Sequence, residues 1–318
     1  MKKLFSLGMA LPLLAFVAPA WAELAYVPNA GSGTVSVIDT ASDKVMRTLS
    51  GDGSLGKKLE GAVVDASGKV VLVVDAPTDS VVAVDAETGK VIKSIPAGKG
   101  PEGIGISADG KIAAACAEDS NEAVLIDVAK LEPIKSIPLQ GKNPEHCMFS
   151  PDSRWLLVSN ENSNDIDVID LQRKKSVALI AGGGHPRGMA FTTDGKFVYI
   201  ADESADSVQV IAVGSWKEVK KIPTALRSAG VLAHPDGSRI YIANGGAGTV
   251  SVIDTHSNEV TATIAVGKRP WNMAITRDGT KLYVANGRSD SVSVIDTAKN
   301  TVVQNVDVGK LPWGVAIR

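Results

Sequence analysis

Short runs of β-branched and apolar residues recur along the chain, and Gly, Asn or Asp bound each run. In the last full copy of this pattern, apolar and polar residues alternate over 272–276, 281–286, 291–296 and 301–306. Such alternation between turn-forming pairs such as Asp278-Gly279 predicts short strands. No stretch keeps a helical period over ten residues. Each unit is therefore expected to hold four strands, called A to D in chain order.

The four-strand unit repeats along the chain. The residues that close strand C are Asp39, Asp85, Asp127, Asp170, Ala212, Asp254 and Asp296. This spacing divides residues 23–318 into seven units and leaves no room for a second domain. Repeated four-stranded units of about 40 to 45 residues are typical of β-propellers. We therefore expect one all-β domain over 23–318, a seven-bladed β-propeller with four antiparallel strands in each blade.

The two ends of the chain predict how the ring closes. The C-terminal segment, from Leu311 to Arg318, supplies a lone strand A, whereas the segment that starts at Ala25 supplies strands B, C and D. The N- and C-terminal segments are therefore expected to pair within one blade. Such closure removes exposed strand edges and fixes both termini.

The first residues indicate an exported protein. Lys2 and Lys3 precede an apolar run over 4–17, which is followed by Ala20-Trp21-Ala22. This order is typical of a secretory signal peptide, and the run is shorter than the roughly 20 residues of a spanning helix. We expect cleavage of residues 1–22, a periplasmic mature protein and no membrane span.

Composition narrows the classes of partner. The 318 residues include 33 Lys and Arg against 35 Asp and Glu, a formal net charge of −2. A mildly acidic chain without a basic block argues against nucleic acid, whose phosphates require clustered cations. We expect a small polar ligand or a protein partner, and a monomer.

Several segments resemble a known repeat. Tyr26-Val-Pro-Asn29, Tyr241-Ile-Ala-Asn244 and Tyr283-Val-Ala-Asn286 are each followed by a Val-Ser-Val-Ile-Asp strand, and together they resemble the YVTN-type β-propeller repeat. The segment 309–315 and the residues around Trp271 are similar to those of periplasmic propeller proteins associated with PQQ-dependent alcohol catabolism. This resemblance implies an accessory role in that oxidation system or in associated transport.

Residues that break the repeat near the start of strand A are candidates for function, because the fold needs only the repeated ones. One position reads Glu60, Glu102, Glu145, Arg187, Ala229, Trp271 and Trp313; the next reads Gly61, Gly103, His146, Gly188, Gly230, Asn272 and Gly314. His185, Arg227 and Arg269 lie just upstream. These side chains predict a rim that binds a small polar ligand or a charged partner. The alternative is solvated loop charges with Trp side chains packed on neighbouring blades. The five glycines indicate either positive φ or a close approach of backbones.

The residues that end strand B support the fold. Six of the seven are Asn or Asp: Asn29, Asp75, Asn160, Asp202, Asn244 and Asn286, with Ala117 in the third unit. Such side chains accept backbone N–H groups in turns. We expect them to accept from the loop that follows.

His146-Cys147-Met148 contains ligands suited to a soft metal. Strand alternation, however, places Cys147 on the opposite face from His146 and Met148, so that no metal is predicted. Cys116 and Cys147 lie in adjacent units, where they form either one disulfide or two buried thiols. His234 and His256 fall in turns and are expected at the surface.

Three functions remain open. The first is a non-catalytic binding or scaffold protein, favoured because catalytic motifs such as Gly-x-Ser-x-Gly are absent from the sequence and no cofactor is predicted. The second is an enzyme or enzyme subunit, since propellers of similar repeat serve as amine dehydrogenase subunits, lactone hydrolases and d1-haem-handling proteins. In that case the rim glutamates would supply acid and base. The third is a surface adhesion module.

Overall fold

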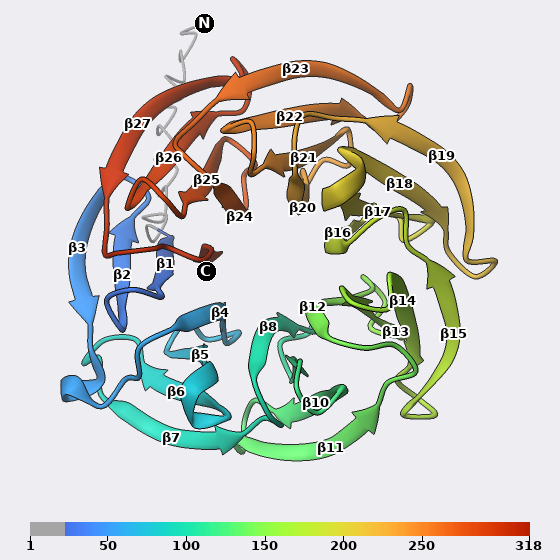
Figure 1. The fold of residues 1–318 in the computed structure, drawn as a ribbon. Coiled ribbons are helices and arrows are strands. Elements are labelled where there is room, and N and C mark those ends of the chain that lie inside the picture. The colour runs from blue at the N-terminus through green and yellow to red at the C-terminus, as the bar shows by residue number, and fades with distance from the viewer. Residues whose placement is uncertain (1–22) are drawn as a thin grey trace, which may run out of the picture.

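The computed structural model describes residues 23–318, in which seven four-stranded antiparallel sheets surround a central axis (Figure 1). The expected signal peptide, residues 1–22, lies outside the described residues. The fold class is the predicted one, a seven-bladed all-β propeller. In the last unit, strands B and C have the predicted bounds, whereas strand A runs from Pro270 to Ile275 instead of over 272–276, and strand D ends one residue later than predicted, at Asp307.

Each class of strand occupies one position in the blades, from the axis outwards. The A strands are β4 (Leu59–Val64), β8 (Pro101–Ile106), β12 (Pro144–Phe149), β16 (Pro186–Phe191), β20 (Ser228–Ala233), β24 (Pro270–Ile275) and β28 (Ala316–Ile317). The B strands are β1 (Leu24–Asn29), β5 (Val70–Asp75), β9 (Ile112–Ala117), β13 (Trp155–Asn160), β17 (Phe197–Asp202), β21 (Arg239–Asn244) and β25 (Lys281–Asn286). The C strands are β2 (Thr34–Asp39), β6 (Ser80–Asp85), β10 (Glu122–Asp127), β14 (Asp165–Asp170), β18 (Ser207–Ala212), β22 (Thr249–Asp254) and β26 (Ser291–Asp296). The D strands are β3 (Lys44–Leu49), β7 (Val91–Pro96), β11 (Glu132–Pro138), β15 (Lys175–Ala181), β19 (Lys217–Pro223), β23 (Glu259–Ala265) and β27 (Thr301–Asp307). Three short 3-10 helices lie in loops: η1 (Gly51–Gly53), η2 (Ala76–Thr78) and η3 (Glu203–Ala205).

The first blade is built from both ends of the chain, in the order β28-β1-β2-β3. Ala25 pairs with Ile317 and Tyr26 with Ala316, and the Leu24 N–H donates to the Arg318 carbonyl at 3.0 Å. Figure 1 shows the C-terminal segment in red on the inner side of the blue strand β1. Closure therefore occurs as expected, although the regular part of the terminal A strand is only two residues long.

The core lies between the blades. An apolar cluster fills each of the seven interfaces between neighbouring blades in the described chain. Each sheet is therefore covered on both faces, and Val71 to Val74 of β5 are buried without interruption. In a sheet with one face open to solvent, buried and exposed residues alternate along each strand. This alternation is lost in the B and C strands, because both faces of each blade are covered. This packing fixes the inner strands around the axis, where the candidate site lies.

Candidate ligand-binding site at the mouth of the channel

A tight backbone turn precedes every A strand on the same face of the ring. The residue two positions before each rim residue has positive φ, between 51° and 72°, in all seven blades: Lys58, Gly100, Asn143, His185, Arg227, Arg269 and Leu311. Non-glycine residues adopt this conformation only infrequently. The repetition of the turn therefore gives the seven rim positions the same placement around the axis.

All seven rim positions line one cavity of about 300 Å³ at the mouth of the channel. The cavity is lined by Ala30, Lys58, Glu60, Glu102, Glu145, His146, Arg187, Ala229, Arg269, Trp271, Asn272, Arg288, Leu311 and Trp313. The structure thus brings together nine of the eleven predicted rim residues. His185 and Arg227 do not line this cavity. A ligand-binding role for these residues remains a prediction.

Four glutamates form an acidic cluster on one side of the mouth: Glu60, Glu102, Glu118 and Glu145. Burial raises the pKa of Glu60 to about 7, against the opposing effect of Lys58, whose Nζ lies 3.2 Å from Glu60 Oε1. Burial and the nearby carboxyl of Glu102 raise the pKa of Glu118 to about 8. Burial, together with Glu145 and Glu60, also holds the pKa of Glu102 well above its usual value. The acidic cluster therefore keeps protons at neutral pH.

Glu145 joins the acidic cluster to the opposite side of the mouth. Burial raises the pKa of Glu145 to about 7, although Arg187 favours its ionised form. Arg187 forms an ion pair with Glu145, and its Nε lies 3.1 Å from Glu203 Oε2. Burial disfavours the charge on Arg187, but Glu145 and Glu203 outweigh it and raise the pKa of the guanidinium. The expectation of solvated rim charges is wrong for Glu60 and Glu145, which are 5% and 1% exposed.

The second half of the mouth is basic and is organised by Glu203 of η3. Arg227 Nη2 lies 2.6 Å and Arg269 Nη2 2.9 Å from Glu203 Oε1. Burial alone would raise the pKa of Glu203, but Arg187 and Arg269 hold it below its usual value. Glu203 is therefore an ionised anchor for three arginines, Arg187, Arg227 and Arg269. Arg227 acts in this network from outside the cavity, and His185 pairs with Glu161 at 2.9 Å instead.

Two aromatic groups meet at the base of the mouth. The rings of His146 and Trp313 lie 5.5 Å apart, and the Asn272 side chain donates to the Trp313 carbonyl at 3.3 Å. Burial lowers the pKa of His146 to about 3, and Arg187 adds to this effect. His146 is consequently a neutral group at physiological pH.

The glycines of the same repeat position are explained by close packing of adjacent A strands. A Cβ on Gly103 would lie 2.1 Å from the Glu145 carbonyl, and one on Gly230 would lie 2.2 Å from the Trp271 carbonyl. These glycines do not have positive φ. Of the two explanations left open by the sequence, the close approach of neighbouring backbones is the one observed.

The two cysteines are joined in a disulfide between β9 and β12, with their Cα atoms 6.2 Å apart. The bond links two neighbouring blades beside the channel, because Cys147 also lines its wall. A cystine sulfur is not a thiolate ligand, which removes Cys147 from any soft-metal set. Within residues 23–318 there is no group of three or more His, Cys, Asp and Glu side chains arranged to hold a metal ion.

The Asn and Asp residues at the ends of the B strands support the fold, but by other contacts than expected. Asn286 donates to Ser291 and Ser293 of the neighbouring C strand, at 3.3 and 2.9 Å. Its Oδ1 accepts the Gly267 N–H at 3.1 Å, so that it holds the loop before strand A. The expected acceptance from the following loop is therefore wrong for this residue.

His234 is also placed differently from the expectation. The side chain is buried, with the residue 6% exposed, and its Nε2 lies 3.0 Å from the Gly279 carbonyl of the next blade. Its surface assignment was wrong because the A–B turn packs against a neighbouring turn. This contact lies outside the mouth cavity.

Sequence reasoning missed five charged residues of the mouth network, the first of which is Lys58, the partner of Glu60. Glu118, Glu161 and Glu203 each follow directly on a B strand, and Arg288 lies in the corresponding loop of the last blade. The signal was present, because the residue after strand B is Ala or Gly in the other four blades. The same comparison of blades that found the rim would have found three acidic exceptions at this position.

No helix in the described residues, 23–318, is long and apolar enough to cross a membrane. The fold and the mouth together define a closed β-propeller with a charged cavity on its axis. Residues 93–177 and 170–308 match the family described as lactonase, seven-bladed β-propeller, and the chain belongs to this family. No curated protein matches the chain in sequence.

Solved structures share the fold over nearly the whole chain. Hydrazine synthase of Kuenenia stuttgartiensis is 24% identical with a TM-score of 0.78, and the match covers 86% of this chain and 92% of that one. A putative 6-phosphogluconolactonase of Bacteroides fragilis is 18% identical, with a TM-score of 0.74 and coverage of 95% and 99%. The dihydro-haem d1 dehydrogenase NirN is 19% identical, with a TM-score of 0.69 and coverage of 92% and 74%. At these identities the likeness concerns the fold.

Proposed function

We propose that the protein hydrolyses a lactone at the mouth of the channel. The observation that carries the proposal is the acidic cluster, of which Glu60, Glu102 and Glu145 line a cavity of ligand size and have raised pKa values. Glu60 Oε2 is buried and has no hydrogen-bond partner among the described residues. A buried polar atom without a partner requires an explanation, and a role in catalysis is one such explanation. Membership of the lactonase family supports the same reaction.

The chemistry follows from the two states of the carboxyls. The ionised carboxylate of Glu60 accepts a proton from water, and the water oxygen attacks the lactone carbonyl. The ring C–O bond then breaks, and the leaving oxygen takes a proton from the protonated pair of Glu102 and Glu118. The product is a hydroxy acid, which contains the lactone plus one water. Carboxyls with pKa values near the working pH suit both proton transfers.

The basic side of the mouth suits the product. Arg269 lines the cavity next to Arg288, which is exposed and forms no ion pair within residues 23–318. Guanidinium groups bind carboxylates with paired hydrogen bonds. Arg288 therefore supplies positive charge for the carboxylate that ring opening creates. Trp271, half-buried beside it, provides a flat face for the ligand.

We propose that the protein acts outside the cytoplasm. The leader over residues 1–22 supports export. The disulfide between Cys116 and Cys147 supports it independently, because such bonds persist in oxidising compartments. Alkylation of the protein from periplasmic and whole-cell extracts, with and without reductant, would measure the state of the two cysteines in the cell.

The test is turnover of a panel of γ- and δ-lactones by the mature protein, followed by proton release. Glu102→Gln removes the ionisable carboxyl while keeping its shape, and we expect kcat/KM to fall about 100-fold or more. Glu132→Gln is the matched control, since Glu132 lies on the outer strand β11 with its side chain 59% exposed. The control should keep the activity of the unchanged protein.

The pH dependence offers a second readout. The base is active only when ionised, so that kcat/KM should rise as pH passes about 7, the pKa of Glu60. The acid is active only when protonated, and activity should fall as pH passes about 8, the pKa of Glu118. A folded protein without turnover on any lactone of the panel would contradict the proposal.

A second candidate is a non-catalytic exported binding protein that serves PQQ-dependent alcohol oxidation. It is supported by the two segments that carry this resemblance, because Trp271 and Trp313 of those segments line the mouth. Ligand binding without turnover, together with recovery of a PQQ-dependent dehydrogenase in a pull-down from periplasm, would favour this candidate over hydrolysis.

A further inference from the structure

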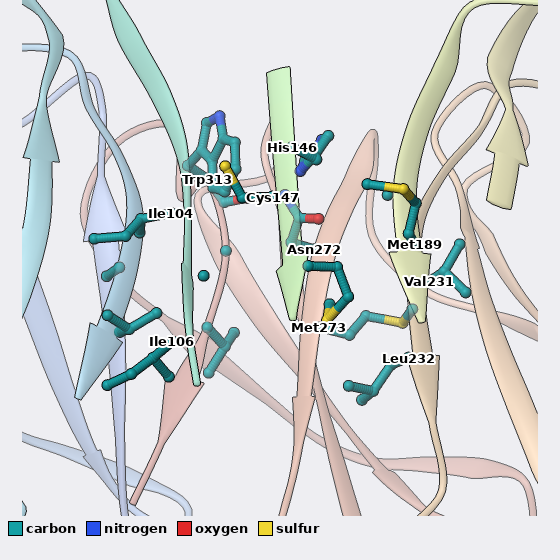
Figure 2. A pocket seen from close by; sticks show the side chains of 17 residues that line it. Ile104, Ile106, His146, Cys147, Met189, Val231, Leu232, Asn272, Met273 and Trp313 are labelled. Atoms are coloured by element: carbon teal, nitrogen blue, oxygen red, sulfur yellow. The ribbon is translucent and has the colours of Figure 1, made fainter. Parts of the chain in front are cut away.

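A second cavity continues from the mouth along the axis. This cavity, here called the bore, also has a volume of about 300 Å³. It shares His146, Asn272 and Trp313 with the mouth cavity, so that the two spaces meet at these residues. Figure 2 shows the bore, with the three shared side chains above apolar side chains from several A strands.

The bore and the mouth differ sharply in polarity. The bore wall contains no Asp, Glu, Lys or Arg, whereas the mouth has seven such residues. The side chains of the bore include Ile104, Ile106, Met189, Val231, Leu232 and Met273. His146, at the junction, is neutral because its burial disfavours the charged form. Polarity therefore falls in one direction, from charged mouth through neutral junction to apolar bore.

We propose that the bore holds the aliphatic chain of a ligand whose polar head lies in the mouth. The inference rests on the proposed function only for the nature of the head, a lactone or the hydroxy acid derived from it. An aliphatic chain in the bore would bury its own apolar surface and that of the bore wall, and removing apolar surface from water is favourable. Methionines such as Met189 and Met273 adapt to chains of different shape, because their unbranched thioethers change rotamer easily.

The dimensions favour a small molecule over a peptide or protein segment. A cavity of about 300 Å³ lies at the lower end of the range for small-molecule sites. Backbone groups of a peptide would also find few hydrogen-bond partners on the apolar wall, and buried groups without partners are unfavourable. A hydrocarbon chain makes no such demand.

The first experiment measures calorimetric binding of a series of straight-chain carboxylates, from butanoate to decanoate. These probes contain no lactone, so that the result does not depend on catalysis. We expect affinity to increase about three- to four-fold for each added methylene until the bore is filled. Beyond that length the increase should stop.

Substitutions test whether the bore is the place of binding. Val231→Phe enlarges a side chain of the bore wall, and we expect it to abolish the dependence of affinity on chain length. Val219→Phe is the matched control, because Val219 lies on the outer strand β19 and is 55% exposed. Thermal unfolding of both variants shows whether a loss of binding comes from a blocked bore or from a damaged fold. If Val231→Phe does not fold, Ile104→Ala widens the bore and should move the limit to longer or branched chains.

The outcomes separate this inference from the proposed hydrolysis. Chain-length dependence without turnover of any lactone would leave the inference standing and contradict the hydrolase. Turnover of lactones with no effect of alkyl length would overturn the inference and keep the hydrolase. Affinity that is unchanged from butanoate to decanoate would show that the bore accepts only water, and it would also overturn the inference.

Discussion

Glu118 and Glu203 occupy the same position of the repeat, directly after strand B, in the third and fifth blades. Their pKa values nevertheless move in opposite directions. The pKa of Glu118 rises to about 8 through burial and the adjacent carboxyl of Glu102. That of Glu203 falls, because Arg187 and Arg269 outweigh the effect of its burial.

The difference shows that the charges brought together around the axis, within a blade and between blades, decide the pKa of a residue, and its position in the repeat does not. The arginines around Glu203 come from three blades: Arg187 and Arg227 are 40 residues apart, and Arg227 and Arg269 are 42 residues apart. In the acidic cluster only two cations of the described residues favour the ionised carboxyls, Lys58 beside Glu60 and Arg187 beside Glu145, and burial outweighs both. Glu203 is therefore an ionised anchor of the network, whereas Glu118 and Glu102 keep their protons at neutral pH, as the proposed function requires.

The largest expected effect comes from breaking the anchor. Glu203→Gln leaves three arginines facing a neutral side chain, and we expect the free energy of unfolding to fall by about 3 kcal/mol. Urea unfolding near neutral pH measures it. Glu259→Gln, on the outer strand β23 and exposed, is the control and should change little. A loss below about 0.5 kcal/mol for Glu203→Gln would show that the arginines find other partners.

A smaller effect of opposite sign is expected for Glu118→Gln. The pKa of Glu118 is about 8 in the folded state and 4.5 in the unfolded state. Below pH 4.5 the carboxyl keeps its proton in both states and does not destabilise the fold. As pH rises from 4.5 through about 8, the unfolded state ionises first, and the free energy of unfolding falls. The substitution removes this loss. Allowing for the partial exposure of Glu118, we expect a gain of about 1 kcal/mol above pH 8 and little change near pH 5.

Unfolding followed across this pH range checks the sign. An equal increase in the free energy of unfolding near pH 5 and above pH 8 would indicate that Glu118 acts through packing and not through its charge. For Glu203 the lowered pKa has the reverse consequence, since its contribution is lost on acidification below its unfolded value of 4.5.

The smallest effect on stability is expected for Arg288→Ala. Arg288 is exposed and has no ion pair within residues 23–318, so that the free energy of unfolding should stay within about 0.5 kcal/mol. Affinity for octanoate, the probe with an anionic head, should nevertheless fall by about ten-fold, because a charge-assisted hydrogen bond is lost. Lys299→Ala, at an exposed C–D turn, is the matched loss of a cation. Equal affinity in both variants would place the anionic head elsewhere.

The fold was largely predictable because its information is local and repeated. The strand bounds over 281–286 and 291–296 followed from alternation and turn pairs, and the unpaired A strand at the C-terminus predicted closure. Continuous burial in β5 was not predicted, since the covering of both faces arises from the neighbouring blades. His234 was misplaced for the same reason, because its partner Gly279 lies in the next blade.

The sequence predicted where the candidate site lies, but it predicted only some of the residues and contacts that form the site. Comparison of blades found the seven rim positions, all of which line the mouth. It could not show that Glu60 and Glu145 are buried, or that Arg187 joins Glu145 to Glu203. It also left the cysteines undecided between a disulfide and two thiols. Each of these facts depends on distances between blades.

By itself the sequence determined the number of blades, the strands within them, the way the ring closes and the ring of positions that break the repeat. These features follow from the backbone preferences of residues close together in the sequence and from the period at which the pattern repeats. Only the tertiary structure decided which carboxyl is an anchor and which keeps its proton, and that an apolar bore continues the charged mouth. Electrostatic interaction and burial depend on what surrounds a group in space, and around this axis groups far apart in the sequence come together, such as Glu203 with Arg227 and with Arg269, which lie 24 and 66 positions away.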